Sequence, residues 1–356
     1  MRLYIFNPEH EISLAYNKER ITMPHIIRQF RHDLSYLPAL WAADGDAVLV
    51  DDITSARKNA AKWIGDRASK IVFVTIDEVG ILQFDMVIPW GWDKSLCRQL
   101  LDAGFDEYSL PDDVTLNRIR DMSNRLQTIL MMGELRYGLE EYTVGEPHYC
   151  TTMEELRANL FTFHDCVLKA PWSSSGRGVK YVEAPIDLPM VGWCRNTLER
   201  QGGVIVEPYY KKVKDFAMEF YSDGHGEVDY CGLSIFNTSG SAYSSNLLAT
   251  EATKEKIITK YVSKDLLDEV KKRICSLMGM ELANVYAGPF GVDMMVVKGG
   301  KLNPCVEINL RMTMGHLALS LSPDDDEVKE RMMIVRQRNS FKLHKRLCPK
   351  RNSRGV

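Results

Sequence analysis

The stretch Phe290-Gly-Val-Asp-Met-Met-Val-Val-Lys-Gly-Gly-Lys-Leu-Asn-Pro-Cys-Val-Glu-Ile-Asn-Leu-Arg311 predicts a β-hairpin whose strands carry acids. Both strands are apolar runs interrupted by single polar residues, and the two glycines between them are a hairpin turn signal. The interrupting residues are Asp293, Glu307, Asn309 and Arg311. Two carboxylates and an amide oxygen on one surface are the hard oxygen ligands that Mg²⁺ takes, so the hairpin predicts a magnesium site. The alternative is the solvent-facing surface of an ordinary sheet.

The pairing register decides whether these ligands meet. Side chains alternate between the two faces of a strand, so a slip of one residue moves Asp293 away from Glu307. A two-residue loop at the glycines puts the carboxylates on opposite faces, whereas a three-residue loop, which pairs Lys298 with Leu302, puts them on one face. We therefore predict the three-residue loop, or an equivalent bulge at Asn303-Pro304.

The composition is that of an ordinary globular protein. The 356 residues allow two or three domains, and they are 45% hydrophobic and 26% charged, with a formal net charge of −3. This charge predicts no nucleic-acid partner.

The eight cysteines are scattered without a C-x-x-C pair, as in reduced cytoplasmic proteins. No apolar run reaches the roughly 18 residues of a membrane helix, and the N-terminus has no signal-peptide core. We expect a cytoplasmic protein without membrane contact, and the sequence leaves its oligomeric state open, a homo-oligomer included.

The first part of the chain predicts a parallel sheet. Longer amphipathic stretches separate four short apolar runs, as in βαβ units, at residues 3–6, 47–50, 71–75 and 86–89. Ligands bind beyond the carboxyl ends of such strands, so the loops at 7–11 and 90–93 are of interest. Glu9, His10 and Glu11 follow the first strand, where they are candidates for holding a substrate amine. For His10, a surface or capping role is the alternative.

The middle of the chain predicts a domain boundary followed by a second domain. Leu110-Pro-Asp-Asp113 breaks the first pattern just before a helical stretch at 114–132. Thr152 opens a capping box for a short helix, and apolar residues at helical spacing across 267–278 predict a long amphipathic one.

The segment 331–356 has nine Lys or Arg residues and no acid, which favours a solvated tail; an anionic partner or a role in assembly is the alternative.

A strand at 167–169 continues into a loop of small residues. The loop offers unhindered backbone N–H groups and hydroxyls to anionic oxygens, and Lys169 at the end of the strand adds a point charge. The candidate phosphate contacts in the loop are Ser173, Ser174, Ser175, Gly176, Arg177 and Gly178. The loop does not match the P-loop pattern, and a surface turn is the alternative.

A second buried strand, at 203–207, ends in an acid followed by a proline and two tyrosines. Its junction with the next strand predicts an adenine site. The residues of this junction are Glu207, Pro208, Tyr209 and Tyr210. Asp215 lies at the mouth of the next strand, where its carboxylate can accept ribose hydroxyls. Farther on, Asn237, Tyr243 and Asn246 are candidates for substrate contacts, with ordinary sheet-edge positions as the alternative.

Taken in order, these elements resemble the ATP-grasp superfamily, the fold of D-alanine:D-alanine ligase, biotin carboxylase and the ATP-dependent purine-biosynthesis ligases. The resemblance covers about residues 110–330, and the first domain resembles the preATP-grasp domain that commonly precedes this fold. It implies an α/β protein, α+β within the ATP-grasp part. The implied divisions are a preATP-grasp domain at 1–112, a lid lobe at about 113–205, a C-terminal lobe at about 206–330, and a basic tail at 331–356.

The resemblance also implies how the chain binds ATP. Lys169 matches the lysine that contacts the nucleotide phosphates, and residues 173–178 match the glycine-rich lid. Residues 207–210 match the hinge that holds adenine, and Asp215 matches the acid that takes the ribose. Many members have a further phosphate-binding lysine upstream, but this chain has no lysine between Lys94 and Lys169. One of three arginines must replace it: Arg118, Arg120 or Arg125.

The hairpin completes the resemblance. Asp293, Glu307 and Asn309 match the magnesium ligands. The segment from Glu307 to Arg311 resembles the E-x-N-x-R pattern of the biotin-carboxylase branch, which makes Arg311 the candidate for the cation that stabilises the transition state. His316, close behind it, either orients a substrate or packs in the interior.

The implied function is an ATP- and magnesium-dependent carboxylate-amine ligase that forms an acyl phosphate. Its partners are a small-molecule or peptide carboxylate and an amine, whose identities the motifs do not specify. A kinase on the same scaffold, which phosphorylates a small metabolite and stops there, needs the same ATP site and is the first alternative. A non-catalytic nucleotide-binding protein is the second, but a protein that only binds nucleotide does not need the full set of metal ligands.

Overall fold

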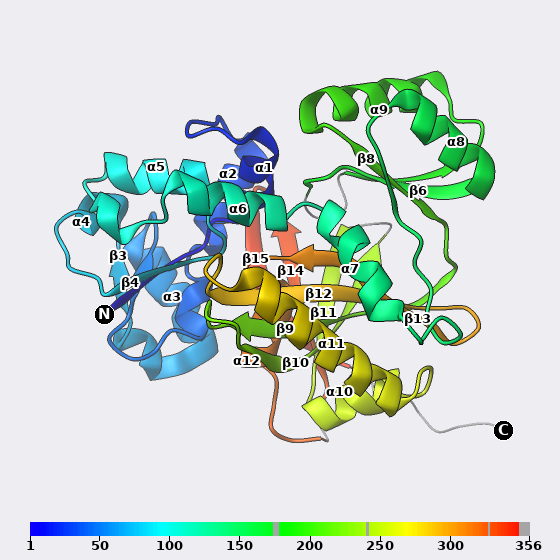
Figure 1. The fold of residues 1–356 in the computed structure, drawn as a ribbon. Helices are drawn as coiled ribbons and strands as arrows, with labels where there is room; N and C mark the ends of the chain where they lie inside the picture. The colour runs from blue at the N-terminus through cyan, green and yellow to red at the C-terminus, as the bar shows by residue number, and fades with distance from the viewer. Residues whose placement is uncertain (174–177, 240–241, 327, 349–356) are drawn as a thin grey trace.

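The computed structural model describes residues 1–173, 178–239, 242–326 and 328–348, and Figure 1 shows how its elements are arranged. The strands are β1 (Arg2–Ile5), β2 (Ala47–Leu49), β3 (Val72–Val74), β4 (Met86–Pro89), β5 (His148–Cys150), β6 (Asp165–Lys169), β7 (Val179–Glu183), β8 (Val204–Pro208), β9 (Lys212–Ser222), β10 (Val228–Ser239), β11 (Ala242–Leu248), β12 (Gly288–Val297), β13 (Lys301–Asn309), β14 (Glu330–Gln337) and β15 (Ser340–Leu347).

The helices alternate with these strands in the first domain and cover the sheets of the second. They are α1 (His10–Tyr16), α2 (His25–Leu34), α3 (Ile53–Ile64), α4 (Ile76–Val79), α5 (Lys94–Asp102), α6 (Asp113–Met122), α7 (Leu126–Arg136), α8 (Met153–Phe163), α9 (Leu188–Gln201), α10 (Glu251–Ile258), α11 (Lys264–Leu282) and α12 (Met314–Ser320). Among the described residues, none of these helices is long and apolar enough to cross a membrane.

The first domain is built on the predicted parallel sheet. The strand order is β3-β2-β1-β4, and each neighbouring pair is parallel. Asp52 and Asp93, which follow β2 and β4, accept hydrogen bonds from backbone N–H groups in the first turns of α3 and α5. These caps satisfy helix N–H groups that otherwise lack partners, and so fix where each helix leaves the sheet. The predicted parallel sheet is confirmed.

A large antiparallel sheet forms the body of the molecule, in the order β13-β12-β9-β10-β11-β14-β15. The predicted long amphipathic helix is α11, which buries Val270, Ile274 and Met278 in the core of this sheet with Phe220 and Phe290. Helices α6 and α7 place their buried side chains in the same core. Figure 1 shows α7 and α11 lying across the strands of this sheet. This layer of helices holds β9, β12 and β13 in fixed positions.

A smaller lobe projects from this body and appears in green in Figure 1. Its antiparallel sheet has the order β5-β8-β6-β7 and packs against α8 and α9 around Leu156, Leu168 and Val206. The predicted capping box is present, because the Thr152 and Glu155 side chains reciprocally bind the first turn of α8. The lobe therefore spans β5 to β8, whereas α6 and α7, which we placed in it from the sequence, belong to the core of the large sheet.

The predicted basic tail is wrong for residues 331–347. Strand β14 pairs with β11, and β15 pairs with β14, so this segment extends the large sheet. Met332 and Leu343 are buried in a core that also contains residues of the first domain. Most of the basic side chains lie among the exposed positions of the two strands, and their charge concealed the alternating apolar positions. Residues 349–356 lie outside the described residues.

Candidate active site

The β12–β13 hairpin has the register that the predicted metal site requires. Its loop holds three residues, 298–300, and Asp293 pairs directly with Glu307. Between the loop and this pair the register shifts, because one residue of β12, Met294, lies opposite three residues of β13, 304–306. An even shift keeps both carboxylates on one face. The predicted three-residue loop is present and begins one residue earlier than predicted, whereas the bulge predicted as its alternative at Asn303-Pro304 is replaced by an even shift at 304–306.

Two cavities meet at these carboxylates, and Asp293 and Glu307 line both. The lobe pocket, of about 500 Å³, lies between the small lobe and the large sheet; its lining includes Lys169, Tyr181, Glu207, Pro208, Tyr209, Tyr210, Lys212 and Asp215. The central pocket, of about 400 Å³, lies between the large sheet and the first domain; its lining includes Phe6, Glu11, Phe30, Trp90, Glu219, Ser234, Tyr243, Asn246, Asn309, Arg311, Arg336 and Phe341. Both volumes are typical of small-molecule sites.

The lobe pocket brings together the residues predicted to hold the nucleotide base, ribose and phosphates. The Lys169 ammonium donates to Glu207 Oε1 at 2.7 Å and to the Val306 carbonyl at 3.2 Å, so a buried ion pair joins β6 to β8 and β13. Asp215 accepts from the Lys212 ammonium at 2.5 Å. Pro208, Tyr209 and Tyr210 line the same cavity, as the predicted hinge requires.

The predicted phosphate loop is only partly described. Ser174, Ser175, Gly176 and Arg177 lie outside the described residues, so their prediction stays open. Ser173 lines the central pocket beside the acids. Gly178 packs against it so closely that a Cβ atom there would lie 2.4 Å from Ser173 Oγ. A glycine is therefore needed where the loop returns to β7.

Arg125 is the one of the three candidate arginines that reaches the site. Its Nη1 donates to the Ala170 carbonyl at 2.5 Å and to Ser173 Oγ at 2.7 Å, and its Nη2 donates to Glu307 Oε1 at 2.6 Å. The other two are used elsewhere, since Arg118 donates to the Asn284 carbonyl and Arg120 stacks over the Trp172 ring. Arg125 therefore supplies fixed positive charge where the chain lacks a lysine.

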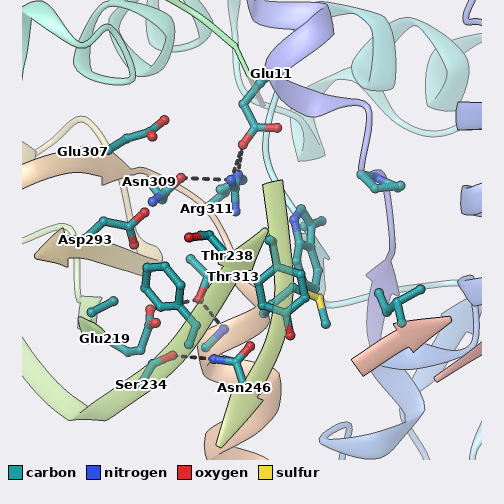
Figure 2. A pocket seen from close by; sticks show the side chains of 18 of the residues that line it. Glu11, Glu219, Ser234, Thr238, Asn246, Asp293, Glu307, Asn309, Arg311 and Thr313 are labelled. Atoms are coloured by element: carbon teal, nitrogen blue, oxygen red, sulfur yellow. Dashed lines mark hydrogen bonds and ion pairs between the residues drawn. The ribbon is translucent and has the colours of Figure 1, made fainter. Parts of the chain in front are cut away.

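Arg311 lies in the central pocket between the predicted metal ligands and the first domain. Its Nη2 donates to Asn309 Oδ1 at 2.9 Å, and its guanidinium forms an ion pair with Glu11 at the start of α1 (Figure 2). Residues from both domains thus fix the position of this guanidinium. Because Arg125 holds Glu307 and Arg311 holds Asn309, two of the three predicted ligands are already oriented by a cation.

The crowding of carboxylates in this site favours a bound cation. Burial raises the pKa of Asp293 well above its usual value, and the neighbouring Glu307 and Glu219 raise it further, while Arg311 opposes them. A divalent cation offsets such repulsion, and carboxylate and amide oxygens are the donors that Mg²⁺ prefers. Asp293, Glu307 and Asn309 therefore fit a magnesium ion in both chemistry and charge.

Glu219, on the floor of the central pocket, was not among the predicted site residues. Its carboxylate accepts from Thr313 Oγ1 at 2.9 Å, and burial raises its pKa to about 7 (Figure 2). It lies on the same face of β9 as Asp215, four residues earlier, and this alternation was the available signal. Arg336 and Phe341 were also missed, because both belong to the segment interpreted as a tail.

His316 lies behind Glu219 and restricts where protons can be. Its Nε2 faces the Phe220 carbonyl at 3.1 Å, which requires a proton on that nitrogen, and burial lowers its pKa to about 4. The neutral ring then presents an unprotonated Nδ1 to Glu219 Oε2 at 3.1 Å and to Thr313 Oγ1 at 3.0 Å. A proton on the Glu219 carboxyl, whose pKa burial raises, bridges these two acceptors.

Gly315 provides the space that Glu219 occupies. A Cβ atom at Gly315 would lie 1.7 Å from Glu219 Oε1, so we expect Gly315→Ala to displace that carboxylate and lower the free energy of unfolding by about 1–3 kcal/mol. Gly133→Ala is the matched control, because Gly133 lies inside α7 with nothing within 4 Å. The control should raise stability by about 0.5–1 kcal/mol in urea unfolding. Equal midpoints for the two variants would contradict the placement of Glu219.

The remaining predicted substrate residues divide into two groups. Tyr243 and Asn246 line the central pocket, as predicted. Three others line neither the central nor the lobe pocket and have partners of their own: Glu9 pairs with Arg31, His10 Nδ1 lies 3.2 Å from Asp93 Oδ2, and Asn237 contacts Ser245. Glu11, in the first turn of α1, lines the central pocket, and His10 lines a smaller adjoining cavity together with Glu307 and Arg311.

Comparison with solved structures identifies the architecture. The structure is similar to a complex of biotin carboxylase from Campylobacter jejuni with β,γ-ATP, with a TM-score of 0.54 and 12% identity, over 94% of this chain and 75% of that chain. Two N5-carboxyaminoimidazole synthetases have a TM-score of 0.49 over 94% of this chain: the Thermus thermophilus enzyme, with 15% identity over 83% of that chain, and the Staphylococcus aureus enzyme with ADP, with 12% identity over 82% of that chain.

No protein-family model matches the chain, and the search of curated proteins found no match. The likeness to biotin carboxylase therefore establishes the fold and not the activity. It extends over both domains, and it confirms the predicted fold class. The chain has the fold of this biotin carboxylase.

Proposed function

We propose that the protein is an ATP- and magnesium-dependent ligase that joins a carboxylate to an amine through an acyl phosphate. One observation carries the proposal: Asp293 and Glu307 line both the lobe pocket and the central pocket. A nucleotide in the first cavity and a substrate in the second meet at these carboxylates. Asp293, Glu307 and Asn309 would hold a metal there, and the metal would neutralise the charge of the nucleotide phosphates.

In the first step, a carboxylate oxygen of the acid substrate attacks the γ-phosphorus of ATP. The bond from this phosphorus to the β,γ-bridging oxygen breaks, so ADP and an acyl phosphate form. Arg125, bound to Glu307, and Arg311, bound to Asn309, contribute positive charge beside the acids, where the charge of the transferred group develops. Both guanidiniums are already oriented by hydrogen bonds, so little reorganisation is needed when the substrates bind.

In the second step, the amine nitrogen attacks the acyl carbon and the bond from this carbon to the phosphate oxygen breaks. An amide and inorganic phosphate form, and the nitrogen must lose a proton. Glu219 lies on the floor of the central pocket and, with His316 behind it, is placed to accept that proton.

The test is a screen for ADP release with Mg²⁺, in which acids and amines are supplied singly and in pairs. A ligase should release ADP only, or much faster, when both substrates are present, and the amide should accumulate in step with ADP. A stable phosphorylated product with an acid or alcohol alone would replace the ligase by a kinase. Nucleotide binding that is indifferent to Mg²⁺, without turnover, would point to a non-catalytic protein.

The pH dependence of the reaction should depend on Glu219. Only its ionised form accepts a proton, so we expect the rate to rise with pH through about 7, the raised pKa of this carboxyl. Glu219→Gln should lose this inflection and slow turnover by about 10²- to 10³-fold. Glu227→Gln, at an exposed position, is the control and should keep the wild-type dependence of the rate on pH.

The same carboxyl should affect stability with a defined sign. The pKa of Glu219 is higher in the folded protein than in the unfolded chain, so its stabilising contribution is full below about pH 4.3 and is lost as the pH rises through about 7. Wild-type stability, measured by urea unfolding without metal, should therefore fall over this range more than that of Glu219→Gln. Parallel curves for the two proteins would contradict the raised pKa.

A further inference from the structure

The floor of the central pocket contains a polar atom that lacks a partner among the described residues. Asn246 is buried and its Nδ2 donates to Ser234 Oγ at 2.8 Å, but its Oδ1 accepts no hydrogen bond from any described residue. The Tyr243 hydroxyl, from the same strand, is also buried, and the Asn246 backbone lies beside it. Buried polar groups are nearly always paired, so the unpaired amide oxygen of Asn246, a residue that lines the cavity, indicates a missing ligand.

The same floor contains two acids. Glu219 and Asp293 line the cavity together with Asn246, and Figure 2 shows Glu219, Ser234 and Asn246 following one another along it. The open amide oxygen of Asn246 needs a donor, and the carboxylates favour a cation. A primary ammonium supplies N–H donors and positive charge in one group, whereas a carboxylate or phosphate supplies neither.

Another part of the lining is aromatic. The Phe6 and Trp90 rings lie 5.0 Å apart in an edge-to-face contact, and Phe30 and Phe341 also lie 5.0 Å apart, edge to face. These rings come from the ends of β1 and β4, from α2 and from β15, so distant parts of the chain build one apolar surface. Such a surface binds apolar groups and ring faces, and it stabilises little else.

We propose that the central pocket binds a primary amine that carries an apolar group about the size of an aromatic ring. The ammonium contacts Glu219 and Asn246 Oδ1, and the apolar group packs against Phe6, Phe30, Trp90 and Phe341. The inference rests on the proposed ligase function in one respect: this amine is the substrate that the ligase acylates. Its binding does not require a nucleotide, because the lobe pocket is a separate cavity.

Isothermal titration calorimetry of three probes with the full chain tests each part of the proposal. The first probe is 2-phenylethylammonium, the second is ethylammonium, which lacks the ring, and the third is 2-phenylethyltrimethylammonium, which lacks N–H donors. We expect the first to bind the wild-type protein at least about tenfold more tightly than either of the others. Equal affinities, or no binding of the first probe at 10 mM, chosen as roughly the weak limit for a small ligand, would overturn the proposal.

Two variants locate the contacts. Asn246→Leu keeps the size of the side chain and should remove the preference for N–H donors, whereas Phe341→Ala should remove the preference for the ring. Phe161→Ala, at a ring that is 90% exposed on α8, is the control and should bind all three probes as the wild type does. Thermal unfolding checks that each variant is folded. If Phe341→Ala unfolds, Phe341→Leu replaces it and should weaken the ring preference without removing it.

A parallel titration with ADP and Mg²⁺ separates this inference from the proposed function. Selective amine binding without nucleotide binding would support the amine site and contradict the proposed ligase function. Nucleotide binding without amine selectivity would overturn the proposed amine site but would not contradict the proposed ligase function. Retained amine selectivity in Asn246→Leu would also overturn the inference, because the contact assigned to the amide oxygen would then be absent.

Discussion

Asp293→Asn should abolish magnesium-dependent ADP release while making the metal-free protein more stable. The carboxylate is one of the three proposed metal ligands and lines both pockets, so its loss should slow turnover by at least about 10³-fold, or about 4 kcal/mol. Stability should rise because the neutral amide no longer repels Glu307 and Glu219. Coupled-assay turnover and urea unfolding of the same preparation measure the two effects.

The sign of the stability effect follows from the raised pKa of Asp293. A group whose pKa is higher in the folded state contributes stability that is full below its unfolded pKa, about 3.9, and is lost as the pH rises through the folded pKa. The advantage of Asp293→Asn over the wild type should therefore grow as the pH rises from about 4. Addition of Mg²⁺ should reduce it, because the wild type binds the ion and the variant does not.

Glu307→Gln should lose turnover as well, but with the opposite effect on stability. The Arg125 guanidinium donates to Glu307 at 2.6 Å, and its side chain is only 4% exposed, so the neutral amide leaves a buried cation poorly compensated. The exposed Asp229, replaced by Asn, is the control for both variants. Unchanged turnover in both Asp293→Asn and Glu307→Gln would contradict the assignment of these two residues as metal ligands. Stability changes of the same sign would contradict the ion pair.

Lys169→Ala should weaken nucleotide binding and destabilise the protein strongly. The variant removes a phosphate contact and also leaves the buried Glu207 carboxylate without its partner at 2.7 Å. Breaking a buried pair in this way costs about 3–5 kcal/mol. Lys58→Ala, at an exposed position of α3, should change stability by less than about 0.5 kcal/mol. Urea unfolding and calorimetric titration with ADP and Mg²⁺ measure the two effects.

A double variant separates these two effects of Lys169. Lys169→Met with Glu207→Gln removes both charges of the pair and should recover most of the lost stability. Nucleotide affinity should remain reduced, because no ammonium remains at the end of β6. Recovery of affinity in the double variant would show that Lys169 acts on the nucleotide only by holding Glu207 in place.

The sequence predicted best where local rules decide the structure. Strand alternation showed that Asp293 and Glu307 share a face only with an odd loop, which the structure has, and the parallel sheet followed from short apolar runs separated by amphipathic stretches. Helix starts followed from caps such as the Thr152 capping box. These features depend on residues close together in sequence or on alternation alone, so no tertiary information was needed.

The sequence predicted fewer of the features that depend on packing between distant parts of the chain. No local signal selects Arg125 from three arginines, because the choice depends on its distance from Glu307, 182 positions later in the chain. The strands β14 and β15 were missed because positive charge on their exposed faces outweighed a short alternating pattern. Glu219 was missed because a single acid in an apolar strand has many structural explanations, and only the facing Thr313 and His316 distinguish it.

The last strand, β15, also determines when the protein can become active during its synthesis. Its Phe341 N–H donates to Asp33 of α2, 308 positions earlier, and its Phe341 ring closes the aromatic wall of the central pocket. At about 5–20 residues per second, synthesis of the 308 positions from Asp33 to Phe341 takes roughly 15–60 s. Until then the ring of Phe30 lacks its edge-to-face contact with Phe341. The pocket exists only once translation has passed Phe341, so nascent chains cannot bind its ligand.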